Sequence, residues 1–387
     1  MGTWPHFEED EINAVTDVLS SGKVNYWTGK ECHLFEQEFA KFIGSKYAIS
    51  LANGTVALEL ALHALGIGVG DDVIVPARTF IASASCVIAR GAGPVVADID
   101  PISQNITAET IEQVLTPKTK AIIVVHLAGW PCDMDSILQF AAKHKLKVIE
   151  DCAQAHGAEY RGKRVGSFGD AAAFSFCQDK IMTTGGEGGM LLTNDEEIWR
   201  RAWAYKDHGK NPNKACADIK QAGFRWVHES FGTNFRMTEM QAAIGRLQLR
   251  KLPAWLETRE RNAKLFCSKL RNIAAFDCTD PPSHIKHAYY KYYVFIKPKL
   301  LKPNWDRNRI VEEINARGVP CGCGSCGEIY LEKAFVDMGL QPKERFPNAK
   351  KLSESSLMFL VHPTLQEEDI LRMCAVICEV LKEAQAI

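Results

Sequence analysis

Residues 171–180 read Ala-Ala-Ala-Phe-Ser-Phe-Cys-Gln-Asp-Lys, and residues 183–189 read Thr-Thr-Gly-Gly-Glu-Gly-Gly. The apolar run from Ala171 to Phe176 predicts a buried strand, and the glycines predict a turn whose backbone can approach a bound group closely. Lys180 stands between the two, where it would be partly shielded from water. Desolvation disfavours the ammonium form, and a neutral amine attacks an aldehyde to form a Schiff base. The alternative interpretation is a solvated loop lysine.

On both sides of this strand, short apolar segments alternate with longer amphipathic ones. The alternation predicts an α/β sheet with helices on its faces, in which ligands bind at the carboxyl ends of the strands. The predicted strands are 47–51, 72–75, 95–98, 121–125, 147–150, 171–176 and 190–193. The predicted helices are 56–65, 81–90, 108–115, 136–144 and 196–205.

The chain of 387 residues is long enough for two packed domains. A break is predicted near Pro253, followed by a charged helical stretch at 257–269. We therefore expect a large α/β domain over residues 1–250 and a smaller α+β domain over 251–387. The expected elements of the smaller domain are a strand at 289–296 and helices at 306–317 and 367–384.

Composition narrows the class of partner. A formal net charge of -1 argues against a non-specific nucleic-acid binder and favours small-molecule partners. The first ten residues contain three acids and no apolar core, which argues against a secretory signal, and no apolar stretch reaches membrane-spanning length. Most of the 13 cysteines stand singly in apolar segments, which is typical of reduced thiols in the cytoplasm.

Cys321, Cys323 and Cys326 form a dense cluster with intervening glycines. Such a cluster either ligates a metal or forms a tight turn. No second pair of Cys or His follows at zinc-finger spacing, so we expect a glycine turn and no metal.

Asn53-Gly54-Thr55 leads from a predicted strand into a predicted helix. The free backbone N–H groups, the helix dipole and the Thr55 hydroxyl would form an anion site. Alternatively, Thr55 only caps the helix. The glycines at 66, 68 and 70 do not match a dinucleotide fingerprint, and the run at 185–189 lacks the Gly-Lys-Ser/Thr of a P-loop.

Glu150 and Asp151 end a predicted buried strand, where an unpaired carboxylate is costly. One of them should have a cationic partner, and Asp151 could pair with a protonated ring nitrogen while Gln154 reaches a phenolic oxygen of the same ring. Alternatively, Asp151 caps a turn and His156 is a satisfied loop histidine. Phe80 follows another strand end and either stacks on a flat cofactor or packs in the core.

Residues 232–243 read Gly-Thr-Asn-Phe-Arg-Met-Thr-Glu-Met-Gln-Ala-Ala, a loop that enters a helix with Thr238 near its N-terminus. These segments occur in one order: Asn-Gly-Thr, Thr-Phe, Glu-Asp-Cys-Ala-Gln, Ser-Phe followed by Lys180, Thr-Thr-Gly-Gly-Glu-Gly-Gly and Asn-Phe-Arg-Met-Thr-Glu-Met-Gln-Ala-Ala. Together they resemble the DegT/DnrJ/EryC1/StrS sugar aminotransferases over about Gly29 to His362. The resemblance implies a pyridoxal-phosphate enzyme of fold type I, with a mixed, mostly parallel central sheet.

The resemblance also assigns roles to residues. Lys180 would carry pyridoxal 5'-phosphate as a Schiff base, and Asp151 would keep the pyridine nitrogen protonated. Phe80 would stack on the ring, with Gln154 near its oxygen. The phosphate would be held by Gly54, Thr55 and Ser175, and by Asn234 from the partner subunit of a homodimer.

Some members of this family have histidine in place of the lysine and act as sugar dehydratases, so Lys180 favours transamination. The implied reaction moves an amino group from L-glutamate to a keto sugar, nucleotide-diphosphate-linked, with ping-pong kinetics. Two alternatives stay open: a keto-cyclitol or unlinked keto sugar as acceptor, and a regulatory protein that binds the cofactor without turnover. Loss of Lys180 or Asp151 would be expected in the regulatory protein, and both are present.

Contacts to the acceptor fall in the least recognisable segments. The candidates are Trp27, Thr28, His208 and Tyr330. Tyr330 ends the run that starts at Cys321, which departs from the proline-rich stretch with a histidine that is often found in this family.

Overall fold

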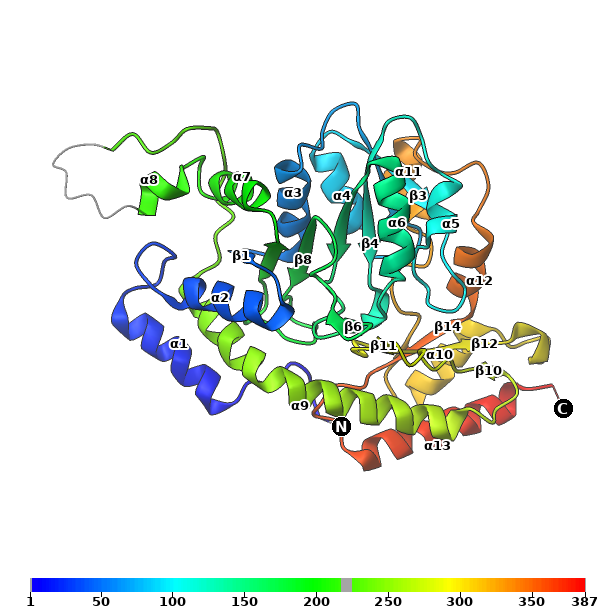
Figure 1. Ribbon diagram of the computed structural model, residues 1–387. Helices are drawn as coiled ribbons and strands as arrows, with labels where there is room; N and C mark the ends of the chain where they lie inside the picture. Colours follow the sequence, from blue (N-terminus) through cyan, green and yellow to red (C-terminus); the bar gives the residue numbers. More distant parts are fainter. Residues whose placement is uncertain (1, 217–224, 387) are drawn as a thin grey trace.

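A sheet of seven strands forms the centre of the protein (Figure 1). The computed structural model describes residues 2–216 and 225–386. The strands follow the order β1-β9-β8-β5-β4-β2-β3, with β9 antiparallel to β1 and β8 and the other neighbours parallel. They are β1 (Tyr47–Leu51), β2 (Asp72–Pro76), β3 (Gly93–Ala97), β4 (Thr119–Val125), β5 (Lys147–Asp151), β8 (Ala171–Ser175) and β9 (Gly189–Thr193). The predicted mixed, mostly parallel sheet is confirmed.

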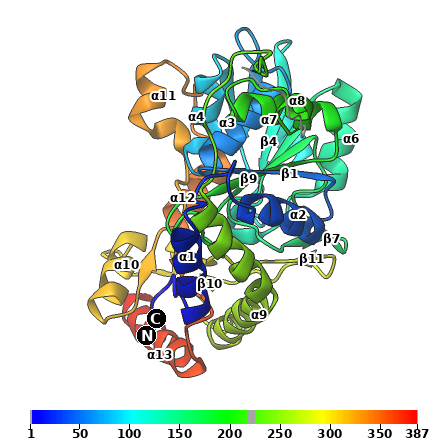
Figure 2. The same ribbon diagram turned by 90° about the vertical axis from the view of Figure 1, so that its left-hand side faces the viewer.

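Helices cover both faces of this sheet, as Figure 2 shows. One face packs against α3 (Gly54–Ala64), α4 (Ala82–Ala89) and α7 (Glu196–Lys206). The other packs against α2 (Glu31–Ile43) and α6 (Met134–His144), with α5 (Ala108–Glu112) beside α6. Because both faces are buried, the strands are continuous apolar runs rather than alternating ones, and all seven were predicted to within a few residues.

The first 46 residues contain two helices that the sequence analysis did not predict, α1 (Glu9–Ser21) and α2. A reciprocal capping box between Glu8 and Glu11 begins α1. The buried positions of α2 include Cys32, Phe35 and Phe39, which recur at helical spacing. The sequence therefore contained signals for both helices.

Pro253, near which the break was predicted, lies inside α9, which runs without interruption from Glu239 to Leu270. Proline inside a helix removes one hydrogen bond and costs about 3 kcal/mol. The buried face of α9, which includes Leu249, Leu252 and Phe266, offsets this cost by packing against both hydrophobic cores. The expected boundary between residues 250 and 251 falls inside α9 and stays a prediction.

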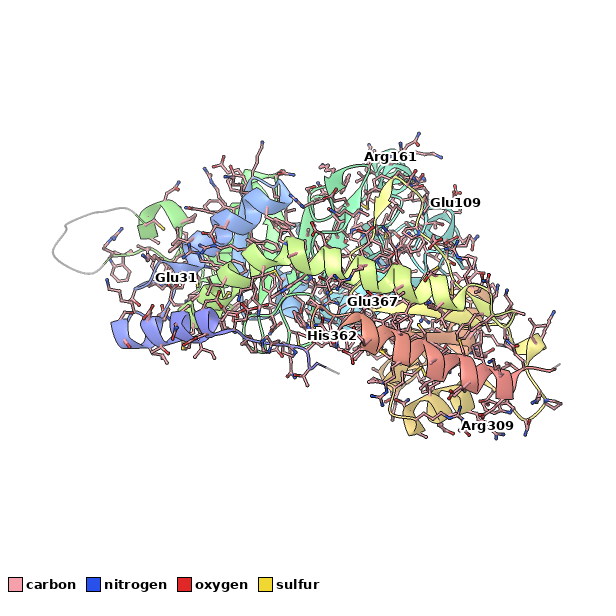
Figure 3. All side chains as sticks on the ribbon, turned by 90° about the horizontal axis from the view of Figure 1, so that it is seen from below. Glu31, Glu109, Arg161, Arg309, His362 and Glu367 are labelled. Carbon is pink, nitrogen blue, oxygen red and sulfur yellow. The ribbon has the colours of Figure 1, made fainter. Side chains whose placement is uncertain are left out.

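A smaller antiparallel sheet lies beyond α9, in the order β10-β12-β14-β13. It has its own apolar core, to which α9, α10 and α13 contribute, and Figure 3 shows α13 alongside α9. The elements are β10 (Phe276–Asp277), β12 (Tyr292–Ile296), β13 (Cys321–Gly322), β14 (Ser356–Phe359), α10 (Arg307–Ala316) and α13 (Glu367–Ala384). The α+β character predicted for this part is confirmed.

Short elements complete the described chain. A three-stranded sheet is formed by β6 (Glu159–Tyr160), β7 (Lys163–Arg164) and β11 (Ile285–Lys286). The remaining helices are α8 (Pro212–Cys216), α11 (Lys333–Asp337), α12 (Pro347–Ser355) and the 3-10 turns Leu127–Gly129, Pro298–Leu300 and Ile329–Leu331. Within the described residues, no helix is both long and apolar enough to span a bilayer.

Candidate active site

A cavity of about 680 Å³ lies where the carboxyl ends of the parallel strands meet. The smaller sheet closes it from the other side through Tyr293 and Met358. Seven of the predicted residues line this cavity together: Gly54, Thr55, Phe80, Asp151, Gln154, Ser175 and Lys180. They follow four different strands and one loop, so the fold brings together residues that are far apart in the sequence.

One corner of the cavity is the N-terminus of α3. The side chain of Asn53 accepts a 3.0 Å hydrogen bond from the backbone N–H of Val56, so Asn53 caps the helix and Thr55 does not. Thr55 is half-buried and faces the cavity instead. A Cβ added to Gly54 would lie 2.6 Å from Cβ of Ser175, so only glycine lets this helix end approach β8 so closely. The helix end and the Ser175 hydroxyl lie together at the cavity, where they could bind an anion, and the anion site itself stays a prediction.

Asp151 ends β5 and is only 7% exposed. Its carboxylate accepts hydrogen bonds from the Ser83 hydroxyl (2.9 Å) and from the backbone N–H of Ala153 (3.1 Å). Burial raises the pKa of Asp151, while these two donors and Lys180 act in the opposite direction. Within residues 2–216 and 225–386, no cationic side chain forms an ion pair with it.

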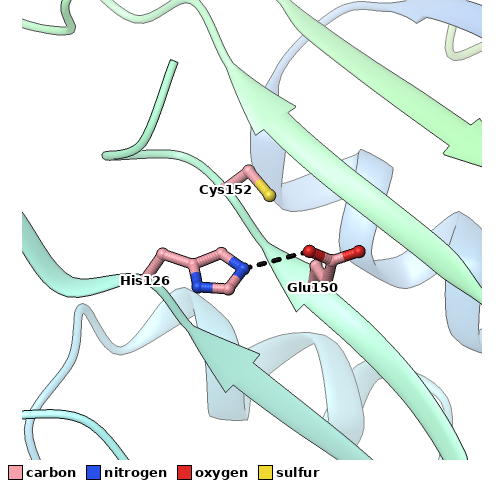
Figure 4. A group of neighbouring side chains, drawn as sticks. All are labelled: His126, Glu150 and Cys152. Atoms are coloured by element: carbon pink, nitrogen blue, oxygen red, sulfur yellow. Dashed lines mark hydrogen bonds and ion pairs between the residues drawn. The ribbon is translucent and has the colours of Figure 1, made fainter. Parts of the chain in front are cut away.

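Glu150, the other acid of the pair, has a structural role. Its carboxylate accepts hydrogen bonds from the backbone N–H groups of Gly166 (2.7 Å), Phe168 (2.7 Å) and Gly169 (2.8 Å), and from Nε2 of His126 (3.1 Å; Figure 4). Burial would raise the pKa of Glu150, but the hydrogen bonds from His126 and the loop hold it below its usual value. His126 was not among the partners expected for this carboxylate from the sequence.

His126, Glu150 and Cys152 form the group whose donor atoms lie close enough to hold a metal ion, as Figure 4 shows. Nδ1 of His126 accepts a 3.0 Å hydrogen bond from the backbone N–H of Cys132, which assigns the ring proton to Nε2. Both oxygens of Glu150 already accept N–H groups. The group is therefore explained as a buried hydrogen-bond network that fixes the loop after β7.

Lys180 lies in the cavity with its side chain 17% exposed. Its Nζ is 3.8 Å from the carboxylate of Asp179 and 5.1 Å from the ring centroid of Tyr290. The same carboxylate accepts a hydrogen bond from the Tyr290 hydroxyl and lies 3.8 Å from Nζ of Lys291. Burial opposes ionisation, but Lys180, Tyr290 and Lys291 together hold the pKa of Asp179 below its usual value. Lys180 thus lies partly shielded from water in the cavity, and its role as a Schiff-base lysine stays a prediction.

The loop with the cysteine cluster forms part of the cavity wall. Gly324 and Ser325 line the cavity, and the Ser325 hydroxyl accepts a 3.4 Å hydrogen bond from the amide of Gln154. Gly324 has φ +89°, and a Cβ there would lie 2.2 Å from the ring of Tyr293. The expected glycine turn is therefore present, and it packs directly against an aromatic wall of the site.

The other five predicted residues do not line the cavity. Asn234, Trp27, Thr28 and His208 are exposed and lie near one another: Asn234 pairs with Asp207, and Nε1 of Trp27 donates to Asp207 over 3.3 Å. Tyr330 is buried; its hydroxyl donates to Glu328 and accepts from the backbone N–H of Phe346. Their predicted roles in binding stay predictions.

Comparisons with known proteins agree with this geometry. The model of the DegT/DnrJ/EryC1/StrS aminotransferase family matches residues 5–378. The crystal structure of an aminotransferase from Psychrobacter cryohalolentis is 54% identical in sequence, with 99% of each chain covered and a TM-score of 0.96. GDP-perosamine synthase of Caulobacter vibrioides is 39% identical over 97% of each chain. The UDP-N-acetyl-3-dehydro-alpha-D-glucosamine 3-aminotransferase of Acidithiobacillus ferrooxidans is 36% identical over 90% of this chain and 88% of its own.

The mixed sheet, the smaller antiparallel sheet and the cavity that contains a lysine define the class of pyridoxal-phosphate enzymes of fold type I. Within that class, the chain belongs to the DegT/DnrJ/EryC1/StrS aminotransferase family, the family of PLP-dependent sugar aminotransferases.

Proposed function

We propose that this protein binds pyridoxal 5'-phosphate and transfers an amino group from L-glutamate to a keto sugar linked to a nucleoside diphosphate. The observation that carries the proposal is the placement of Lys180 and Asp151 in one cavity, with an anion site at the N-terminus of α3. The similar proteins from C. vibrioides and A. ferrooxidans are named for GDP- and UDP-linked sugars. These names support a nucleotide-linked acceptor.

Three features of the cavity fit this cofactor. Asp151 is a buried carboxylate without an ion-pair partner among the described residues, and a protonated pyridine nitrogen would supply one. The end of α3 offers backbone N–H groups to a phosphate. Phe80 is a large aromatic side chain that is 65% exposed at the cavity wall, and a stacked ring would cover it. Gln154, with its amide held by Ser325 and Ala128, would lie near the ring oxygen.

The cofactor, when bound, supplies an electron sink that stabilises negative charge on the carbon next to the reacting nitrogen. Asp151 would keep a proton on the ring nitrogen, because an opposite charge stabilises the buried carboxylate. Lys180 would hold the cofactor, and its freed amine would act as the general base that moves the proton from the donor Cα. Asp179 and Tyr290 orient its amine.

Asn234 would complete the phosphate site from the partner subunit of a homodimer. In one chain it is exposed and lies outside the cavity lining, which a role in the partner's cavity would explain. Trp27, Thr28 and His208 share its surface region and would contact the acceptor bound at that interface. All thirteen cysteines are free thiols, which supports a reducing compartment, the cytoplasm.

Two alternatives use the same site. A keto-cyclitol or an unlinked keto sugar would need the same chemistry at Lys180. A regulatory protein that binds the cofactor without turnover would not need the Lys180 and Asp151 pair, and both are positioned in the cavity.

The test supplies the enzyme with cofactor, ¹⁵N-labelled L-glutamate and a panel of acceptors: GDP-, UDP- and dTDP-linked keto sugars, free keto sugars and keto-cyclitols. Mass spectrometry then detects any product that carries the label. Label in a nucleotide-linked sugar and not in the unlinked compounds is the expected result. Transfer only to unlinked acceptors would overturn the nucleotide-linked assignment, and transfer to none would favour the regulatory alternative.

A further inference from the structure

A second lysine, Lys291, lines the cavity beside Lys180 and has no part in the chemistry described above. Its side chain is 16% exposed, and its Nζ lies 4.7 Å from the ring centroid of Tyr290. Nζ of Lys180 lies 3.8 Å from Oδ1 of Asp179, and Nζ of Lys291 lies 3.8 Å from Oδ2 of the same carboxylate. Asp179 therefore stands between two cavity amines.

The charges at this end of the cavity do not balance. Asp179 is shared by Lys180, Lys291 and the Tyr290 hydroxyl. Behind them lies Arg259, which is 1% exposed; its guanidinium donates to the backbone carbonyls of Tyr289 and Tyr290. Within the described residues, no acid forms an ion pair with Arg259. Asp179 is thus shared by two lysines, and Arg259 adds a third positive charge near Lys291. Because buried charges are normally paired, this end of the cavity favours an anionic ligand.

Other groups near Lys291 do not remove this excess. His362 packs on the same side, and burial lowers its pKa to about 4, so it is neutral at pH 7. Burial lowers the pKa of Lys291 itself to about 8; Asp179 acts against this shift, and Arg259 and Lys180 add to it. Lys291 is therefore still mostly a cation at pH 7, but it is easily neutralised by a rise in pH.

We propose that Lys291 anchors the α-carboxylate of the amino donor. This inference rests on the proposed function and deepens it. The α-carboxylate of an amino acid is attached to the carbon that carries the reacting nitrogen. When that nitrogen takes the place of Lys180, the carboxylate must lie within a few ångströms of the former Nζ position. Lys291 is the other amine on Asp179, so it stands next to that position.

A keto sugar carries no carboxylate at the reacting carbon, so this anchor would act mainly in the first half-reaction. A hydrogen bond between a charged amine and a carboxylate contributes more to the binding free energy than a hydrogen bond between neutral groups. Its role is to select and orient the donor, while proton transfer stays with Lys180. Lys291→Met should therefore weaken donor binding more than it slows the step that follows.

The experiment compares the cofactor-loaded wild type with Lys291→Met, Lys291→Arg and the surface control Lys333→Met, whose ion pair with Asp337 is exposed. Binding of maleate, a dicarboxylate that cannot react, is measured by calorimetry between about pH 7 and about pH 9. Single-turnover rates are measured for L-glutamate and, with the aminated enzyme, for the keto-sugar acceptor. Cofactor content and thermal unfolding establish that each variant is folded.

We expect Lys291→Met to weaken maleate binding and raise the half-saturating glutamate concentration by about 10- to 100-fold. Lys291→Arg should restore most of the loss, and Lys333→Met should match the wild type. Maleate binding to the wild type should weaken as the pH rises through about 8, because the amine loses its proton, and Lys291→Arg should not show this loss. The acceptor half-reaction should change little.

Unchanged maleate and glutamate affinity in Lys291→Met, or a loss confined to the acceptor half-reaction, would overturn the inference. A wild type that L-glutamate fails to aminate would instead contradict the proposed donor, and maleate binding would still decide the role of Lys291.

Discussion

The indole Nε1 of Trp4 donates a 2.8 Å hydrogen bond to the backbone carbonyl of Lys180, across 176 residues of sequence. The Trp4 ring also packs edge-on against Trp255, with the centroids 5.1 Å apart, and lies 5.3 Å from the guanidinium carbon of Arg259. The N-terminal segment thereby holds the loop that contains Lys180. Loops hold their functional side chains in place only when the scaffold fixes them in this way.

Trp4→Phe should keep the packing but remove this hydrogen bond. Its loss leaves a carbonyl without its partner and costs about 1 kcal/mol locally. We expect faster release of cofactor on dialysis and a modest fall in turnover. Trp305→Phe, in a residue that packs against Arg309 beside the smaller sheet, is the matched control. Equal cofactor retention in the two variants would argue against a role for Trp4 in holding the loop.

Lys180→Ala should remove the amine that holds the cofactor and moves the proton. Loss of a general base alone costs about 100- to 10,000-fold in rate. The visible absorption of the lysine-bound cofactor should disappear while circular dichroism stays unchanged. Lys333→Ala, at an exposed ion pair, should retain both properties. Normal turnover in Lys180→Ala would exclude its assigned role.

Gly54→Ala should force apart the N-terminus of α3 and strand β8. The added Cβ would lie 2.6 Å from Cβ of Ser175, and overpacking of this kind costs about 1–3 kcal/mol. Cofactor affinity should fall about tenfold or more, because the displaced backbone forms the anion site. Fluorescence titration with pyridoxal phosphate measures this affinity.

Further variants show whether the loss is steric. Gly68→Ala meets no atom closer than 3.5 Å and should bind the cofactor normally. Ser175→Gly removes the clashing Cβ but also the hydroxyl of the anion site, so the double variant Gly54→Ala/Ser175→Gly is compared with Ser175→Gly alone and should bind the cofactor about as well. Clearly weaker binding in the double variant would mean that Gly54 acts through something other than this close approach.

Asn234→Ala should weaken cofactor binding in the partner's cavity, if Asn234 reaches across a homodimer. Mixing this inactive or weakened variant with Lys180→Ala tests the arrangement directly. In mixed dimers, one cavity would combine an intact Lys180 with an intact Asn234, so about a quarter of wild-type activity should return. No recovery after subunit exchange, verified by native mass spectrometry, would place Asn234 outside the partner's site.

His156 should make the fold sensitive to acid. Burial lowers its pKa to about 3 from an ordinary value of 6.5, so between these values the unfolded chain binds a proton that the folded protein does not. Above pH 6.5 His156 is neutral in both states and does not reduce the free energy of unfolding. As the pH falls from 6.5 toward 3, protonation of the unfolded chain lowers that free energy progressively. His63, His287 and His362 shift in the same direction.

His156→Phe tests this effect in urea unfolding of the cofactor-free protein between about pH 7 and about pH 5. The wild type should lose stability with falling pH more steeply than the variant, by about 2 kcal/mol in total between these two pH values. Equal slopes in the two proteins would show that His156 is protonated in the folded state.

The central sheet could be predicted because its strands are buried on both faces and form continuous apolar runs. The uninterrupted course of α9 could not be predicted. Pro253 is a local signal for the end of a helix, whereas the packing that keeps α9 intact involves both hydrophobic cores. Helix α2 was missed although Phe35 and Phe39 recur at helical spacing. The signal for this helix is therefore present in the sequence.

The residues of the candidate site also fall into two groups, those that local motifs predict and those that only the folded structure brings together. Lys180, Asp151 and Gly54 follow strand ends and belong to recognisable motifs, and the structure brings them together. The partners of Lys180 carry no local signal, because Tyr290 reaches Asp179 across 111 residues and Trp4 reaches Lys180 across 176. Such contacts arise only when the segments around the smaller sheet and the N-terminal segment pack against the large sheet. Lys291 belongs to this second group.

The visible absorption spectrum of the purified protein with pyridoxal phosphate, before and after addition of L-glutamate, tests the central claim most directly. The account predicts a visible band from the lysine-bound cofactor that disappears on addition of glutamate, as the aminated cofactor forms and absorbs at shorter wavelength. The absence of any such band after pyridoxal phosphate is added, or a band that no amino donor changes, would contradict the claim that this protein is a PLP-dependent aminotransferase.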